Sequence, residues 1–249
     1  MDELTQRQID ILTAIIREHT ETGQLVGSEI IEKKYKLGVS PATIRNEMVA
    51  LEKKNYLQKA HFSSGRLPSP KGYRFFINNV MKEKELSTVD EVAYKHSIWD
   101  EREKRYRMLS QASRVLAQRT GLLSLVATNS GELYYAGTYH LLEDEDMFDN
   151  LISKQIFERL DEVNFWAEIL RQTHVSREEL YFILGTDDFR DPIFDSCSSI
   201  FGDFEAEGIR GIIGVVGPKY LKFELIAPQI RFFSHLIEDM IKEQKQLLH

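Results

Sequence analysis

Apolar residues recur at intervals of three and four along the first fifty residues, the period of an amphipathic helix. Threonine, serine, proline and glycine interrupt this period at the places where helices begin and end. Thr5 forms a capping-box pattern with Gln8, Gly23 offers a left-handed stop, and Ser40-Pro41 supplies an N-cap followed by a first-turn proline. Three helices are therefore predicted, over residues 6–21, from Ser28 to the residue before Gly38, and from Ser40 to about Lys54.

A hairpin and a fourth helix follow. Residues 56–59 are strand-like, and Ser63-Ser64-Gly65 is a turn signal directly ahead of Arg66. Ser69-Pro70 repeats the cap-plus-proline start and predicts a helix from Lys71 to about Lys82. Three helices followed by a hairpin with a basic tip are the pattern of a winged helix-turn-helix, so we assign residues 1–82 to one such domain.

The rest of the chain predicts a second domain of the α+β class. Residues 83–100 are charged and weakly periodic, as in a linker or a helical connector, and residues 101–249 alternate between helical and strand-like segments. Helices are predicted over residues 101–119, 147–172 and 220–246, the last interrupted or started by Pro228. Strands are predicted over residues 122–128, 132–141, 180–184 and 210–216.

The charge is unevenly distributed along the chain. The formal net charge is −7, which taken alone argues against a nucleic-acid partner. Residues 33–80, however, hold ten lysines and arginines and only two acidic residues, Glu47 and Glu52. Such a local excess marks a surface that faces a polyanion, or a solvated basic surface without a partner.

The third predicted helix has an apolar side and a polar side. On a wheel of about 100° per residue, Ile44, Met48 and Leu51 fall together and predict the buried side. The opposite side combines groups that contact DNA bases, since arginine bonds guanine bidentately, asparagine bonds adenine, and alanine or valine touches the thymine methyl. These residues are Ala42, Arg45, Asn46 and Val49. An ordinary amphipathic surface helix is the alternative.

Other residues suit contacts to the DNA backbone. Ser40 and Thr43 lie at the predicted start of the third helix, where free amide groups attract phosphate, and Lys53 lies near its end. Arg66 would lie on the wing and reach a minor groove or a phosphate. Lys71 and Arg74, at the start of the fourth helix, would touch the backbone or remain solvated.

The chain lacks the patterns of catalytic and metal sites. The single cysteine, Cys197, excludes an intramolecular disulfide and a cysteine-rich zinc site, and no histidine lies near it in sequence. The glycines between Gly208 and Gly217 match no nucleotide-binding loop and favour close strand packing. The acidic run at residues 143–146 lacks the spacing of a calcium loop. We expect no enzyme activity, no cofactor, no metal and no membrane segment, and a cytoplasmic location.

The residues quoted above resemble those of the heat-inducible transcription repressor family HrcA. The resemblance is most specific in Val39-Ser-Pro-Ala-Thr-Ile-Arg-Asn-Glu-Met48 and in Ser63-Ser-Gly-Arg-Leu-Pro-Ser-Pro-Lys-Gly-Tyr-Arg74. Leu4–Ser28, Pro192–Cys197 and Gly211–Pro218 are also similar to that family, so the likeness covers both ends and most of the middle.

The resemblance implies a winged-helix DNA-binding domain joined to a GAF-like domain. It implies a homodimer that binds double-stranded DNA at an inverted-repeat operator, called CIRCE, upstream of chaperone genes. It also implies that the GroE chaperonin assists repression and that heat relieves it. Family members usually carry an inserted dimerisation domain within the GAF-like part, and here that insert is absent or reduced, because residues 122–128 lead almost directly to the next strand.

Two alternative functions remain open from sequence. One is a ligand-responsive regulator with a small molecule in the GAF-like domain, near Tyr134, Tyr135 and Tyr139. The same tyrosines fill a core if no ligand binds. The other is a winged-helix module that binds a protein and has no operator.

Overall fold

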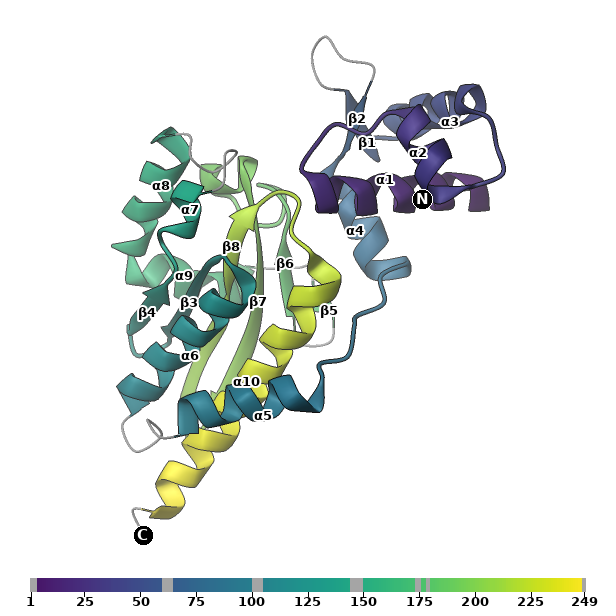
Figure 1. Cartoon of the computed structure of the whole chain (residues 1–249). Coiled ribbons are helices and arrows are strands. Elements are labelled where there is room, and N and C mark those ends of the chain that lie inside the picture. The colour runs from purple at the N-terminus through teal and green to yellow at the C-terminus, as the bar shows by residue number, and fades with distance from the viewer. Residues whose placement is uncertain are drawn as a thin grey trace. The chain divides into compact units, whose positions relative to one another are not determined.

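The computed structural model describes residues 4–59, 65–99, 105–143, 150–172, 176–177 and 180–247. The chain divides into two compact units, unit 1 (Met1–Lys82) and unit 2 (Glu83–His249). Helices and antiparallel sheets occur in both units, so the predicted α+β class is confirmed (Figure 1).

Unit 1 consists of helices and one small hairpin. Apolar residues from all its helices form its core, including Ile11, Ile15 and Ile31, which are fully buried. The antiparallel hairpin pairs Leu57 with Pro68 and Lys59 with Arg66. The elements are α1 (Gln6–Thr22), α2 (Ser28–Tyr35), α3 (Pro41–Lys53), β1 (Leu57–Lys59), β2 (Arg66–Pro68) and α4 (Pro70–Asn79).

Local capping accounts for most of these helix boundaries. The Thr5 side chain accepts from the Gln8 amide while the Gln8 side chain accepts from the Thr5 amide, which is the predicted capping box. The Ser40 and Ser69 hydroxyls accept from the amides three residues later in α3 and α4. The prediction for α2 is wrong in one detail, because Gly27 occupies its N-cap without a side-chain bond and Ser28 is already helical.

A third chain segment extends the hairpin of unit 1. Val26 and Arg66 exchange both backbone hydrogen bonds, with N···O distances of 3.1 and 3.0 Å. The segment between α1 and α2 is thereby paired with β2. This pairing joins residues that are 40 positions apart in the chain (66 minus 26).

Unit 2 is built on one antiparallel sheet of six strands. Their order is β4-β3-β8-β7-β6-β5, and each neighbouring pair is antiparallel. The strands are β3 (Leu123–Thr128), β4 (Leu133–Ala136), β5 (Ser176–Arg177), β6 (Leu180–Ile183), β7 (Cys197–Ala206) and β8 (Ile209–Pro218).

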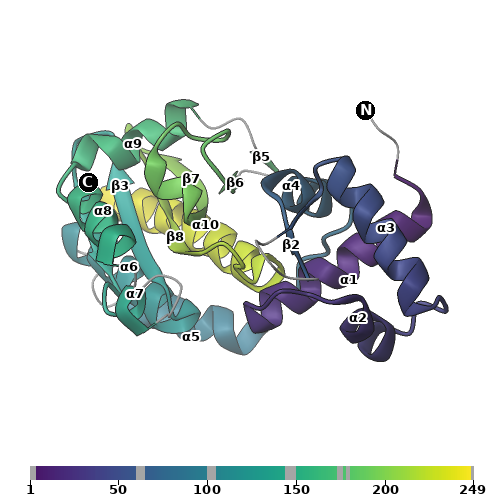
Figure 2. The same ribbon diagram turned by 90° about the horizontal axis from the view of Figure 1, so that it is seen from above.

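Helices cover both faces of this sheet (Figures 1 and 2). One face packs against α6 (Arg105–Thr120) and α10 (Phe223–Leu247). The other packs against α8 (Asn150–Leu160) and α9 (Val163–Gln172), and its core includes the fully buried Trp166 and Phe201. Residues between β6 and β7 add the short helix η1 (Pro192–Asp195) to this second core.

The helix α5 (Thr88–Trp99) packs within unit 2. Its Tyr94 ring stacks on Phe233 of α10, with the ring centroids 5.2 Å apart, and its hydroxyl donates to Gln229. Arg119 of α6 lies over the same ring. Much of the charged segment at residues 83–100 is therefore a packed helix.

One strand predicted from sequence is too long, and one long strand was missed. The strand predicted over residues 132–141 ends at Ala136, because Gly137 takes a left-handed conformation (φ 80°) and α7 (His140–Glu143) follows. The long strand β7 was not predicted. It is buried on both faces for most of its length, so it lacks the alternation that marks a half-exposed strand.

Replacing Trp166 with alanine is expected to lower the unfolding free energy of unit 2 by about 3–5 kcal/mol, because a buried aromatic side chain leaves a cavity. Urea denaturation followed by circular dichroism measures this loss. Phe157→Ala on α8, where the side chain is 38% exposed, is the matched control and is expected to cost much less. Equal losses in the two variants would contradict the central position of Trp166 in the core.

Candidate nucleic-acid interface

Burial divides α3 along its length into two sides. Ile44, Met48 and Leu51 are at most 3% exposed and form the inner side, as the helical wheel predicts. The outer side is exposed to solvent and carries Ala42, Arg45, Asn46, Val49 and Lys53. The four residues expected to contact bases and the lysine expected to contact phosphate therefore share one accessible surface.

Polar contacts fix the rotation of α3 on α1. The Gln8 side-chain amide donates to the Glu47 carboxylate at 3.0 Å, and the Lys54 ammonium donates to the Gln8 side-chain oxygen at 3.2 Å. Arg7 lies 3.8 Å from the same Glu47 carboxylate. These contacts fall beside the apolar side of α3, and they hold its exposed side in one orientation.

The start of α3 concentrates hydroxyl and amide groups. The Thr43 amide donates to the Ser40 hydroxyl at 3.2 Å, and the two side-chain oxygens lie 3.0 Å apart. Ser40 is exposed and Thr43 is half-buried. The N-terminal end of a helix carries partial positive charge on its free N–H groups, so this end of α3 attracts an anion.

Arg66 does not lie where the sequence suggested. Its side chain is buried, its Nε donates to the Glu52 carboxylate at 2.8 Å, and its Nη1 donates to the Gly65 carbonyl at 3.2 Å. This arginine joins β2 to α3 and is not an exposed wing residue, so the predicted groove contact is corrected to a positioning role. Ser63 and Ser64 of the expected turn at the tip of the wing lie outside the described residues.

The start of α4 brings two further basic side chains to unit 1. The exposed Lys71 donates to the Lys54 carbonyl at 2.8 Å, and its ammonium lies 4.3 Å from the centre of the Tyr56 ring. Arg74 is half-buried on the same helix. Lys71 thus lies at the C-terminal end of α3.

The two acidic residues within 33–80 are both engaged by other side chains. Glu47 contacts α1, and Glu52 forms the ion pair with Arg66. The exposed side of α3 itself carries Arg45 and Lys53 and no acidic residue. Two of the ten basic residues counted from sequence therefore lie on the accessible side of α3. The pairing of Glu52 with Arg66 was missed, because nothing in the helical period signals a partner 14 residues away.

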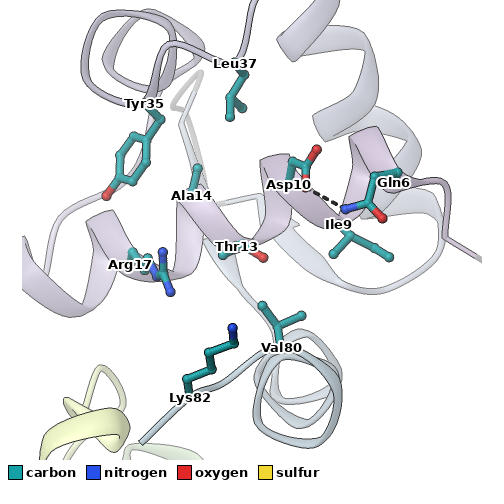
Figure 3. Close-up of a pocket in the computed structure, with 10 residues that line it drawn as sticks. All are labelled: Gln6, Ile9, Asp10, Thr13, Ala14, Arg17, Tyr35, Leu37, Val80 and Lys82. Atoms are coloured by element: carbon teal, nitrogen blue, oxygen red, sulfur yellow. Dashed lines mark hydrogen bonds between the residues drawn. The ribbon is translucent and has the colours of Figure 1, made fainter. Parts of the chain in front are cut away.

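A second surface of unit 1 is a hollow of about 500 Å³ on the outer side of α1 (Figure 3). Apolar side chains from Ile9, Ala14, Leu37 and Val80 line it together with polar groups. Burial, and then the hydrogen bond to Glu18, raise the pKa of Tyr35 at its edge to about 12. The residues assigned to DNA contacts are not among those that line it, so this surface is separate from the exposed side of α3.

The other candidates in unit 2 have structural roles. Cys197 is fully buried, and burial raises the pKa of its thiol, so it remains protonated and unreactive. The three tyrosines weighed as ligand contacts do not converge, since Tyr134 donates to Glu132 while Tyr135 and Tyr139 are about half exposed. A side chain at Gly211 or Gly214 would collide with a phenylalanine of β7, as close strand packing requires.

The described part of the chain holds neither a candidate metal cluster nor a helix suited to a membrane. No cluster of three or more histidine, cysteine, aspartate or glutamate residues able to hold a metal ion occurs among the described residues. Likewise, no helix in the described ranges combines the length and apolar character needed to cross a membrane. Of the acidic run at 143–146, only Glu143 falls within these ranges.

Comparison with known proteins gives consistent matches over most of the chain. The family model described as HrcA protein C-terminal domain matches residues 71–226. The heat-inducible transcription repressor HrcA of Clostridium tetani (strain Massachusetts / E88) is 43% identical over 141 residues, which cover 56% of this chain and 40% of that protein. The protein of the same name from Clostridium perfringens (strain SM101 / Type A) is 32% identical over 188 residues, or 71% of this chain and 55% of that one. The chain thus spans about half the length of the curated relatives it matches.

A solved structure shares the fold of the chain. The crystal structure of a protein described as hypothetical superposes with a TM-score of 0.79 and covers 97% of this chain and 100% of that one. The two sequences are 16% identical, so this likeness concerns the fold alone.

Replacing Arg66 with alanine is expected to lower the local stability of unit 1 by about 1–3 kcal/mol, because Glu52 loses its charged partner. Hydrogen exchange of the amides in α3 and β2 measures this loss directly. Lys53→Ala, a charge removal on the exposed side of α3, is the control and is expected to change exchange by less than about 0.5 kcal/mol. Unchanged exchange in Arg66→Ala would remove its assigned role in joining β2 to α3.

Proposed function

Because the chain belongs to the HrcA family, we propose that it is a transcriptional repressor that binds DNA sequence-specifically through unit 1. The observation that carries this proposal is the exposed side of α3, where Ala42, Arg45 and Asn46 lie opposite a fully packed apolar side. Arginine and asparagine are the side chains that bond guanine and adenine bidentately in the major groove.

Unit 1 is proposed to act as a winged helix-turn-helix. In this arrangement α3 enters the major groove, α2 crosses ahead of it, and the β1–β2 hairpin forms the wing. The close succession of α2 and α3 and the pairing of Val26 with the hairpin support this assignment. Arg66 contributes by holding the hairpin on α3 through Glu52.

The base contacts are assigned to Ala42, Arg45 and Asn46. Phosphate contacts are assigned to Lys53, to Ser40 and Thr43 at the start of α3, and to Lys71 and Arg74 on α4. Phosphate contacts set the position and register of the protein on the duplex, and base contacts select the sequence.

The wider activity follows from the family and is proposed for this chain as a whole. The target is a CIRCE-like inverted repeat upstream of chaperone genes, bound by a homodimer in the cytoplasm and released by heat, with GroE as a partner. Unit 2 is proposed to be a GAF-like regulatory and dimerisation domain. Tyr134, Tyr135 and Tyr139 do not converge on one site. Trp166 and Phe201 fill the core beneath α8 and α9, so no observation on the described residues favours a small-molecule function.

Fluorescence anisotropy tests the proposal at fixed salt. The full chain is titrated into a labelled CIRCE-like inverted repeat and into a scrambled duplex of equal length and composition. A preference of about 10³-fold or more for the repeat is expected, as for other specific DNA-binding proteins. Equal and weak binding to both duplexes would contradict the proposed function.

Arg45→Ala is expected to weaken operator binding by about 1–3 kcal/mol and to relax specificity at one base pair, because a bidentate base contact is lost. Anisotropy against operators that carry each base at each position identifies this base pair. Uniform weakening at all positions would instead assign Arg45 to the DNA backbone.

Lys53→Ala is expected to weaken binding to all sequences alike and to reduce the salt slope by about one, because a single phosphate contact is lost. Titrations at several salt concentrations measure the slope. Lys242→Ala, an exposed lysine of α10 in unit 2, is the control and is expected to leave the slope unchanged. A slope that does not change in Lys53→Ala would remove Lys53 from the interface.

A further inference from the structure

The chain that follows unit 1 is fastened to α10 by an ion pair. Both terminal nitrogens of the Arg231 guanidinium donate to the Glu83 carboxylate, one to each oxygen. The two side chains are only 21% and 16% exposed. A bidentate arginine–carboxylate pair of this kind is geometrically specific as well as strong, so Glu83 has one preferred position on α10.

A backbone bond next to this ion pair depends on a proline. Pro228 lies inside α10 and has no amide proton to give to the Glu224 carbonyl one turn earlier. The amide of Lys84 donates to that carbonyl, with an N···O distance of 3.1 Å. The Glu224 carbonyl therefore receives no hydrogen bond from residue 228, and the amide of Lys84 donates to it instead.

Backbone hydrogen bonds hold the end of unit 1 on α4 as far as Met81, two residues before Glu83. The amides of Val80 and Met81 donate to the Phe76 carbonyl of α4, at 2.9 and 2.8 Å. Lys82 is therefore the one residue between the last backbone bond to α4 and the ion pair on α10. The sequence suggested a linker or connector over residues 83–100, but the joint is about one residue long and lies at Lys82, just before that segment.

We propose that Glu83 and Arg231, with the bond from Lys84 to Glu224, are positioning residues for operator recognition. They fix the point at which each DNA-binding unit leaves unit 2, and they thereby set the spacing between half-sites that a dimer accepts. This inference rests on the proposed function, in which two copies of unit 1 bind an inverted repeat.

The reach of the connecting chain determines whether the bonds of Glu83 and Lys84 affect the half-site spacing that a dimer accepts. A free chain of n residues spans about 5–6 Å × √n, so release of the six residues 82–87 adds roughly 12–15 Å of reach. Each base pair advances about 3.4 Å along the duplex, so this reach covers several base pairs. A joint of one residue adds only about 3.8 Å of chain, and the fastened dimer is expected to reject altered spacers that a released dimer accepts.

The main experiment measures affinity against operator spacing. The full chain and its Arg231→Gln variant are titrated by anisotropy into inverted repeats whose spacer is lengthened or shortened by one and two base pairs. The unaltered chain is expected to discriminate between the best and worst spacers by at least about tenfold, and Arg231→Gln by less than about threefold, because effective concentration falls when the tether is loose.

A second variant separates release of the chain from loss of stability. In Pro228→Ala the amide of residue 228 is expected to donate to the Glu224 carbonyl in place of the Lys84 amide. At the same time, α10 gains a better helix-forming residue. This variant is expected to keep or raise the melting temperature and still to tolerate altered spacers. Arg210→Gln, which removes an exposed arginine from Asp203 and Glu205, is the control and is expected to keep the spacing preference of the unaltered chain.

Trypsin cleavage tests the fastening without DNA. Lys82 and Lys84 are exposed and lie on either side of Glu83. Cleavage after these lysines, followed by mass spectrometry, is expected to be several-fold faster in Arg231→Gln and Pro228→Ala than in Arg210→Gln.

The outcomes distinguish this inference from the proposed function. If the unaltered chain does not prefer the inverted repeat over the scrambled duplex, the proposed function fails, and the inference fails with it. If the unaltered chain selects one spacing and Arg231→Gln selects it as sharply, only the positioning role is overturned. Unchanged cleavage in both variants would likewise overturn it, whatever the affinities.

Discussion

The exposed groups of α3 owe their position to burial of the opposite side of the same helix. Ile44, Met48 and Leu51 leave water together, and this determines which side of the helix faces outward. Burial alone leaves the helix free to rotate by small amounts, because apolar contacts are not directional. Two carboxylates of α3 remove that freedom with directional bonds, Glu47 to Gln8 of α1 and Glu52 to Arg66 of β2. The proposed DNA contacts thus depend on residues that need not touch DNA.

Local rules account for the parts of this arrangement that the sequence predicted. The caps at Thr5, Ser40 and Ser69 and the two sides of α3 follow from contacts within a few residues along the chain. The same rules fail where partners are distant. The ion pair of Arg66 with Glu52, and the choice of Gly27 over Ser28 as a cap, depend on neighbours that periodicity does not specify. Strand β7 was missed because both its faces are buried, which removes the alternation of half-exposed strands.

Unit 2 combines a packed sheet with a first segment, Glu83 and Lys84, that is bonded directly to α10. Helices on both faces place aromatic side chains such as Trp166 and Phe233 at the centre of each layer. The bonds from Glu83 and Lys84 reach the start of α10, the helix that also holds α5 through Tyr94. A change in the packing of α10 therefore alters the position of Glu83 and Lys84, the residues that directly follow unit 1.

The pairing of Val26 with Arg66 also bears on how the protein is made. It closes a loop that contains the whole of α2 and α3, and loop closure is a cost that must be met before the enclosed contacts form. A nascent chain that has exposed α3 but not yet β2 lacks both this pairing and the partner of Glu52. During synthesis, the helix that carries Arg45 and Asn46 is therefore complete in sequence before it is held in place. The proposed recognition surface is therefore held in place only after residue 66 has emerged from the ribosome.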